Sequence, residues 1–187
     1  RFNPSINYLK NLISKKLLGN IISIRCINGE YLPSWHPYED YRDSYAANKN
    51  LGGGALLTQI HDFDYIYWLF GMPEFITCFG GKVSNLNINV EDAVQVAMQF
   101  KKKIPLTLNL NYLEQPPNRS ITVIGDKGSI VCDLTKNIIS LKFIDKKIKK
   151  INFSNYRRND MFIDELKDFF NFYKGKTKAK VDIQESM

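Results

Sequence analysis

The sequence predicts an α+β fold: an open, predominantly antiparallel β-sheet with helices on one face and an opposite face that serves oligomerisation. Two observations lead to this fold class. Helical periodicity is concentrated before residue 71 and near the end of the chain, whereas residues 75–153 alternate apolar and polar side chains in short runs. The runs are joined by short polar or glycine-containing turns, which connect antiparallel neighbours. Helices gathered before a series of strands indicate an α+β architecture.

The first expected helix covers residues 4–16. Pro4 suits its first turn, because a proline there gives up no helical hydrogen bond. The apolar side chains recur at helical spacing and form one stripe, made of Ile6, Leu9, Leu12 and Ile13. Gly19 ends the helix, and residues 20–31 form the first expected strand.

A long loop and a glycine-flanked helix follow. Residues 33–50 are rich in tryptophan, tyrosine, proline and charge, and a long ordered loop in a compact domain is usually functional. A run of glycines then opens an apolar segment with helical period, which predicts one helix over residues 55–70. The run consists of Gly52, Gly53 and Gly54. Glycines there indicate a tight turn that lets a cofactor or substrate approach, in preference to a phosphate cradle.

This expected helix carries a titratable pair on an otherwise apolar segment. His61 and Asp64 are one turn apart and share a face. Either the two side chains form a hydrogen-bonded pair in the core, or the helix presents His61 to a reacting group. Two ligands at this spacing do not make a metal site without a third, so we predict no metal.

The second half of the chain contains the expected strands and a final helix. The predicted strands cover residues 75–83, 93–100, 106–112, 120–124, 129–134, 138–143 and 147–153. Asp126-Lys127-Gly128 has the composition of a hairpin turn. Residues 160–173 form the last expected helix, with Phe162, Leu166, Phe169 and Phe170 on one face.

Two central strands leave an alternate face without charge. In residues 93–100 and 106–112, one set of alternating side chains is apolar and the other is threonine, asparagine and glutamine. Such a face either packs against a partner sheet in a homodimer or tetramer, or is exposed to solvent with hydrated asparagine and glutamine side chains.

Size and composition restrict the class of protein. A length of 187 residues suits one domain, and no apolar run is long enough to span a membrane. The net charge of +7 comes from lysines spread over turns, without a nucleic-acid-binding motif, so no nucleic-acid partner is expected. Cys26, Cys78 and Cys132 are distant from one another and are expected to be buried reduced thiols of a cytoplasmic protein.

Several segments in order resemble one known family. They are Arg1-Phe2-Asn3-Pro4, the loop Ser34-Trp35-His36-Pro37-Tyr38-Glu39-Asp40-Tyr41-Arg42, the glycine run with its helix up to Gly71, residues 119–130, and residues 159–166. Together they resemble the C-terminal substrate and dimerisation domain of the glucose–fructose oxidoreductase / inositol dehydrogenase (Gfo/Idh/MocA) family. The resemblance implies an NAD(P)-dependent oxidoreductase that transfers a hydride at a sugar or nucleotide-sugar.

The cofactor-binding half of that family has no counterpart here. No strand–GxGxxG–helix pattern and no Glu-Lys-Pro occurs in the chain. We therefore expect a fragment that lacks its N-terminal Rossmann domain and is inactive alone. NAD or NADP would bind mainly to that domain, so the choice between them, the sugar and the reaction direction stay open.

The resemblance also assigns candidate site residues. His61 is the candidate general acid/base, and the glycine run is the turn beside the cofactor. Substrate-binding candidates are Trp35, Asp40, Tyr41, Arg42, Tyr45, Thr58 and Asp64. Aromatic rings suit the apolar face of a sugar, and an arginine suits a carboxylate or phosphate.

One departure supports a rival interpretation. Many family members carry an aspartate one turn before the histidine, where Leu57 stands, and one branch carries an acid where Thr58 stands. The alternative is a catalytically idle relative that serves assembly or ligand sensing. A basic sheet that binds nucleic acid is the weakest hypothesis.

Overall fold

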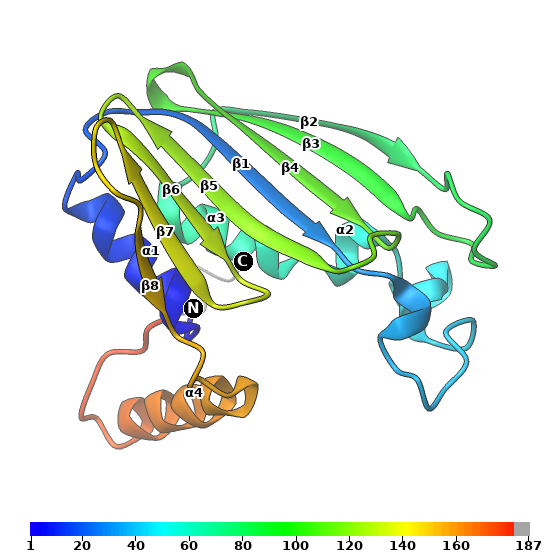
Figure 1. Ribbon diagram of the computed structural model, residues 1–187. Helices are drawn as coiled ribbons and strands as arrows, with labels where there is room; N and C mark the ends of the chain where they lie inside the picture. The colour runs from blue at the N-terminus through cyan, green and yellow to red at the C-terminus, as the bar shows by residue number, and fades with distance from the viewer. Residues whose placement is uncertain (182–187) are drawn as a thin grey trace.

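The computed structural model describes residues 1–181, and within them one mixed sheet carries the fold. Eight strands lie in the order β2-β3-β4-β1-β5-β6-β7-β8, with the helices on one side of the sheet (Figure 1). The strands are β1 (Ile21–Gly29), β2 (Phe75–Gly81), β3 (Ala93–Phe100), β4 (Ile104–Asn111), β5 (Asn118–Gly125), β6 (Gly128–Asp133), β7 (Ile138–Phe143) and β8 (Lys149–Asn152). The predicted α+β class is confirmed.

The position of β1 is the main feature that strand-by-strand analysis did not reveal. β1 lies between β4 and β5, pairs parallel with β4, and pairs antiparallel with β5. All other neighbouring pairs are antiparallel. An early strand can enter the middle of a sheet because the segment between β1 and β2 is long enough to cross over it.

The helices are α1 (Pro4–Ser14), α2 (Ala55–Thr58), α3 (His61–Phe70) and α4 (Arg158–Tyr173). α1 begins at the N-cap Asn3, whose side chain accepts hydrogen bonds from the amides of Ser5 and Ile6, and it packs over β6 and β7. α2 lies over β3 and β4, and α1 contacts α3. α4 stands apart below α1, and none of its side chains is buried (Figure 1).

The apolar core lies between the sheet and α1 to α3. The alternation predicted in β3 and β4 is confirmed, since the inward residues of both strands are buried. They are Val94, Val96, Met98, Phe100, Leu106, Leu108 and Leu110. Burying a side chain of this kind contributes about 1.5–3 kcal/mol, so these rows anchor the helices on the sheet.

The opposite face of the sheet is open. Gln95, Gln99 and Thr107 are exposed there, together with Phe75 and Phe79 of the edge strand β2. The face is not free of charge, because Arg25 of β1 lies beside Thr107. β1 comes from a distant part of the sequence, so the patterns of β3 and β4 could not indicate this charge.

Two expectations about single elements were wrong. The predicted helix over residues 55–70 is interrupted at Gln59 and Ile60, so that His61 begins a separate helix. Cys78 is exposed, whereas Cys26 and Cys132 are buried as expected. Cys78 lies on the edge strand β2, whose residues no helix covers.

Candidate functional site

The glycine run holds α2 against the loop that precedes it. A Cβ atom on Gly53 would lie 2.4 Å from the carbonyl oxygen of Tyr45, so only glycine allows this approach. Gly54 has a φ of +110° and is the N-cap of α2. The amide of Leu56 donates to the Glu91 carboxylate at 3.1 Å, which therefore occupies the N-terminus of this short helix.

Thr58 is part of the structural support of α2. Its hydroxyl lies 2.6 Å from the hydroxyl of Tyr112 and donates to the carbonyl of Gly54 at 2.8 Å. Tyr112 is fully buried, and its single hydroxyl proton can serve either Oγ1 of Thr58 or, at 3.3 Å, the carbonyl of Ala46. Burial raises the pKa of the Tyr112 hydroxyl, so this group stays protonated. Thr58 thus links the glycine turn and the loop to the sheet.

After the break, His61 and Asp64 both lie in the first turns of α3, but their side chains have different surroundings. His61 is exposed at the first position of α3. Asp64 forms an ion pair with Arg1 at 2.9 Å, so its carboxylate is directed to the N-terminal segment of the chain. The structure therefore gives His61 no orienting contact with Asp64.

Asp62, the neighbour of His61, anchors the first turn of α3 in the core. Its side chain is 0% exposed, and Oδ2 accepts hydrogen bonds from Nδ2 of Asn28 at 2.8 Å and Nη2 of Arg119 at 2.9 Å. Oδ1 accepts a further hydrogen bond from the hydroxyl of Tyr65. Burial raises the pKa of the Asp62 carboxyl, and the positive charge of Arg119 opposes this rise.

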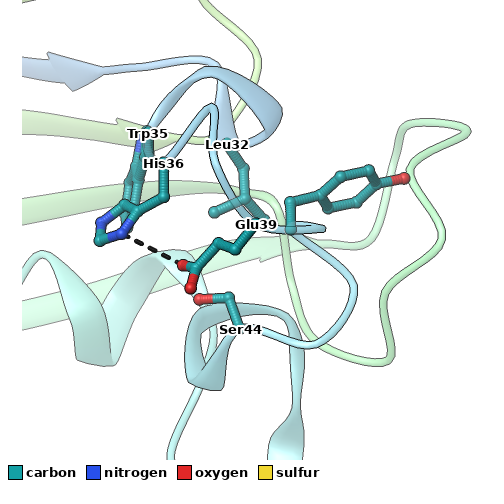
Figure 2. Close-up of a pocket in the computed structure, with 6 residues that line it drawn as sticks. Leu32, Trp35, His36, Glu39 and Ser44 are labelled. Carbon is teal, nitrogen blue, oxygen red and sulfur yellow. Dashed lines mark ion pairs between the residues drawn. The ribbon is translucent and has the colours of Figure 1, made fainter.

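The loop between β1 and α2 is built from short 3₁₀ turns. Trp35 packs edge-on against Tyr112, with ring centroids 5.3 Å apart, and its indole Nε1 is buried with no partner in the described part of the chain. Figure 2 shows a small cavity lined here by Leu32, Trp35, His36, Glu39, Tyr41 and Ser44. Its volume is about 10 Å³, enough for one water molecule.

The charged residues of this loop pair with one another. Arg42 binds the Asp40 carboxylate and holds its pKa at about 2 through a side-chain hydrogen bond. Nδ1 of His36 lies 3.1 Å from Oε1 of Glu39 (Figure 2). Tyr45 is exposed. The loop is thus ordered by its own contacts and keeps an aromatic outer surface.

An open groove of about 590 Å³ lies between α2 and the β2–β3 hairpin. Its lining residues are Lys49, Gly53, Leu57, Gly81, Lys82, Asn89, Val90 and Glu91. Leu57 is half-exposed and precedes His61 by four residues, across the break between α2 and α3. Asn89 Oδ1 accepts from the amide of Lys49 at 2.7 Å, which ties the two walls together.

The structure brings some of the predicted residues together and separates others. Trp35 and Tyr41 line one cavity, and Gly53 lines the groove eight residues before His61. Thr58 faces Tyr112, directly after the end of β4, whereas Asp64 faces Arg1. Sequence reasoning missed Asp62, Arg119, Glu91 and the two groove lysines. An acid directly after His61 was the one signal available for Asp62, and Glu91 had none because its contact is 35 residues away in sequence.

Two further observations limit the chemistry of the described residues 1–181. No group of three or more histidine, cysteine or acidic side chains among them could hold a metal ion. No helix within this range is long and apolar enough to cross a membrane.

Comparison with known proteins places the chain in a family. The family model described as the GFO/IDH/MocA C-terminal domain matches residues 6–131. A curated relative, 2,7-anhydro-N-acetylneuraminate hydratase of Escherichia coli K12, is 26% identical over 145 residues, which are 75% of this chain and 38% of the relative. An uncharacterized oxidoreductase of Synechocystis is 23% identical over 150 residues, which are 70% of this chain and 38% of the relative's length.

Solved structures share the fold. The WlbA dehydrogenase of Bordetella pertussis, in complex with NADH and UDP-GlcNAcA, has a TM-score of 0.76 at 21% identity and covers 98% of this chain and 53% of its own. A levoglucosan dehydrogenase in complex with NADH has a TM-score of 0.80 at 17% identity, over 96% of this chain and 56% of its own. The chain thus spans about half the length of these structures and less of the curated relatives. Over the matched residues it belongs to the GFO/IDH/MocA C-terminal domain family.

Proposed function

We propose that this chain is the substrate-binding and dimerisation domain of a larger NAD(P)-dependent oxidoreductase that acts on a sugar or nucleotide-sugar. The observation that carries the proposal is the position of His61, exposed at the start of α3 and four residues after the groove residue Leu57. Family membership supports it, together with the NADH and UDP-GlcNAcA named for the relatives.

His61 would act on the proton of the substrate. As a general base it would accept the proton of a sugar hydroxyl while the hydride leaves the same carbon, and it would return a proton in the reverse direction. Imidazole suits both directions because it ordinarily titrates near neutral pH.

The cofactor would be held mainly outside this chain. The glycine turn offers no phosphate site, because the Glu91 carboxylate already accepts the Leu56 amide. When bound by an N-terminal nucleotide-binding domain, NAD or NADP would supply the hydride acceptor. We therefore propose that the 187 residues alone are inactive.

The groove is the proposed place of the sugar. Leu57 offers apolar surface to a sugar ring, and Glu91 can accept hydrogen bonds from hydroxyl groups. Lys49 and Lys82 can bind a carboxylate or phosphate, and with Glu91 they leave the groove with a formal charge of +1, two minus one. The curated hydratase is named for an acidic sugar, which is consistent with this charge.

The alternative is a catalytically idle relative that serves assembly or ligand sensing. Two observations favour it: Leu57 lines the groove where an acid would stand, and the Thr58 hydroxyl is engaged with Tyr112. No carboxylate at either position can assist His61.

Self-association through the open sheet face is part of the proposal. Exposed phenylalanines and uncharged polar side chains on β2, β3 and β4 support a partner sheet in a homodimer or tetramer. Arg25 would have to find an acceptor or an offset position in such an interface.

The test uses the full-length protein, assayed against a panel of neutral and acidic sugars and nucleotide-sugars with both cofactors. We expect His61→Ala to lower kcat by about 10² to 10⁴ while cofactor affinity stays near normal, because general base catalysis is of that size. His36→Ala removes the other of the two histidines and is the matched control. Near-native turnover of His61→Ala would make His61 structural, and no turnover of the native protein on any sugar would favour the idle relative.

A further inference from the structure

The orientation of His61 cannot come from the glycine turn. α2 ends at Thr58 and α3 begins at His61, with Gln59 and Ile60 between them. The amides of Asp62 and Phe63 bond to the carbonyls of Gln59 and Ile60 at 3.1 and 3.0 Å, which is the spacing of a tight turn. Because the helical hydrogen bonds of α2 do not continue into α3, contacts made by α3 itself must set its start.

That contact is made by the residue next to His61. The carboxylate of Asp62 is held by Asn28 of β1, by Arg119 of β5 and by Tyr65 one turn further along α3. Arg119 also lies over the ring of Tyr65, 5.8 Å from its centroid. Two neighbouring strands thus hold the first turn of α3 at a defined place on the sheet.

Stability alone does not require charged and polar residues in the cluster around Asp62. A buried ion pair often contributes no more to stability than well-packed apolar residues of similar volume. The Oδ1 atom of Asn28 and the Nε atom of Arg119 are buried and have no hydrogen-bond partner in the part of the chain that the structure describes. Each such atom costs free energy, whereas directed hydrogen bonds fix geometry more narrowly than apolar contacts do.

We infer that Asp62 and Arg119 are positioning residues, which lock the first turn of α3 to β1 and β5 and thereby fix the place of His61 at the start of that helix. The inference rests on the proposed role of His61 as general acid/base. Neither residue needs to touch the substrate.

The test replaces the pair with apolar residues in the full-length protein. Asp62→Leu combined with Arg119→Met removes both charges together, since either change alone would leave a buried charge or its partner unpaired. The matched control is Asp164→Leu with Lys167→Met, which removes an exposed ion pair on α4.

Hydrogen exchange is the first readout, because it does not depend on activity. In the Asp62/Arg119 double variant we expect the amides of Asp62, Phe63 and Asp64 to exchange about tenfold or more faster, while the amides of β1 and β5 keep their protection. The control should change neither set. Native exchange at the three amides in a folded double variant would overturn the inference, and so would equal acceleration throughout the sheet.

Kinetics separate this inference from the proposed function. We expect the double variant to lower kcat by about 10- to 100-fold with KM unchanged within about twofold, because a small misplacement of a reacting group has that cost. If His61→Ala abolishes turnover but the double variant retains native kcat, the inference is wrong and the proposed function stands. If His61→Ala has no effect, the proposed function fails, and the exchange data alone decide whether the pair fixes α3.

Discussion

The contact between Thr58 and Tyr112 gives a prediction that separates a structural threonine from a substrate-binding one. The two hydroxyl oxygens are 2.6 Å apart, and Tyr112 is 0% exposed. The net contribution of one intramolecular hydrogen bond to the free energy of unfolding is about 1 kcal/mol. Thr58→Val removes this bond and the one to the Gly54 carbonyl, so we expect the free energy of unfolding to fall by about 1–2 kcal/mol.

Tyr112→Phe should have a smaller effect of about 1 kcal/mol. The Ala46 carbonyl still accepts from the amide of Gly54 at 3.1 Å, so the change leaves no buried acceptor unpaired. In a chain of 187 residues, 1 kcal/mol corresponds to a shift in Tm of about 2–4 °C. The double variant should lose less than the sum of the single losses, because both changes remove the same bond.

Urea unfolding of the four proteins of this cycle measures these terms. Thr177→Val, at an exposed position after α4 and away from the sheet, is the control and should stay within about 0.5 kcal/mol of the native protein. If Thr58→Val leaves stability unchanged and raises only the KM of the full-length enzyme, the reasoning is refuted, and Thr58 is a substrate-binding residue after all.

Three further predictions concern the open sheet face and the thiols. Replacing Gln95 and Thr107 with lysine places like charges on the proposed interface. In sedimentation velocity, these changes should convert an oligomer to a monomer. A native protein that is monomeric at high concentration would contradict the proposed interface. Under native conditions a maleimide should modify Cys78 and spare Cys26 and Cys132, because burial raises the pKa of Cys26 well above its usual value and that of Cys132 to about 12. Unfolded thiols ionise near pH 9, so above that pH the unfolded chain releases protons that the folded chain keeps. The free energy of unfolding should therefore fall as the pH rises from 9 towards 12. Stability that does not depend on pH in that range would refute the raised pKa values of Cys26 and Cys132.

Local periodicity predicted most elements of the fold. The strand over residues 138–143 begins and ends where the structure has it, and the apolar rows of β3 and β4 form the core as expected. Alternation identifies a strand and its buried face, but two strands of equal pattern can pair with several neighbours. The place of β1 between β4 and β5 was therefore not visible in the sequence.

The candidate site was predictable in part. The glycine run and His61 stood out because three glycines before an apolar segment are unusual, and the groove does include Gly53. The spacing of His61 and Asp64 suggested a pair that the structure does not contain, since Arg1 supplies the partner of Asp64 from 63 residues away.

The sequence by itself determined the fold class, the family, the buried faces of β3 and β4, and the histidine to consider. These features depend on short-range periodicity and on residues adjacent in the chain. The tertiary structure decided which acid anchors the first turn of α3 and what occupies the N-terminus of α2. Each of these depends on a hydrogen bond or charge contact between residues more than 30 positions apart, such as Asp62 with Arg119 and Leu56 with Glu91. These residues come within bonding distance only when the helices pack on the assembled sheet.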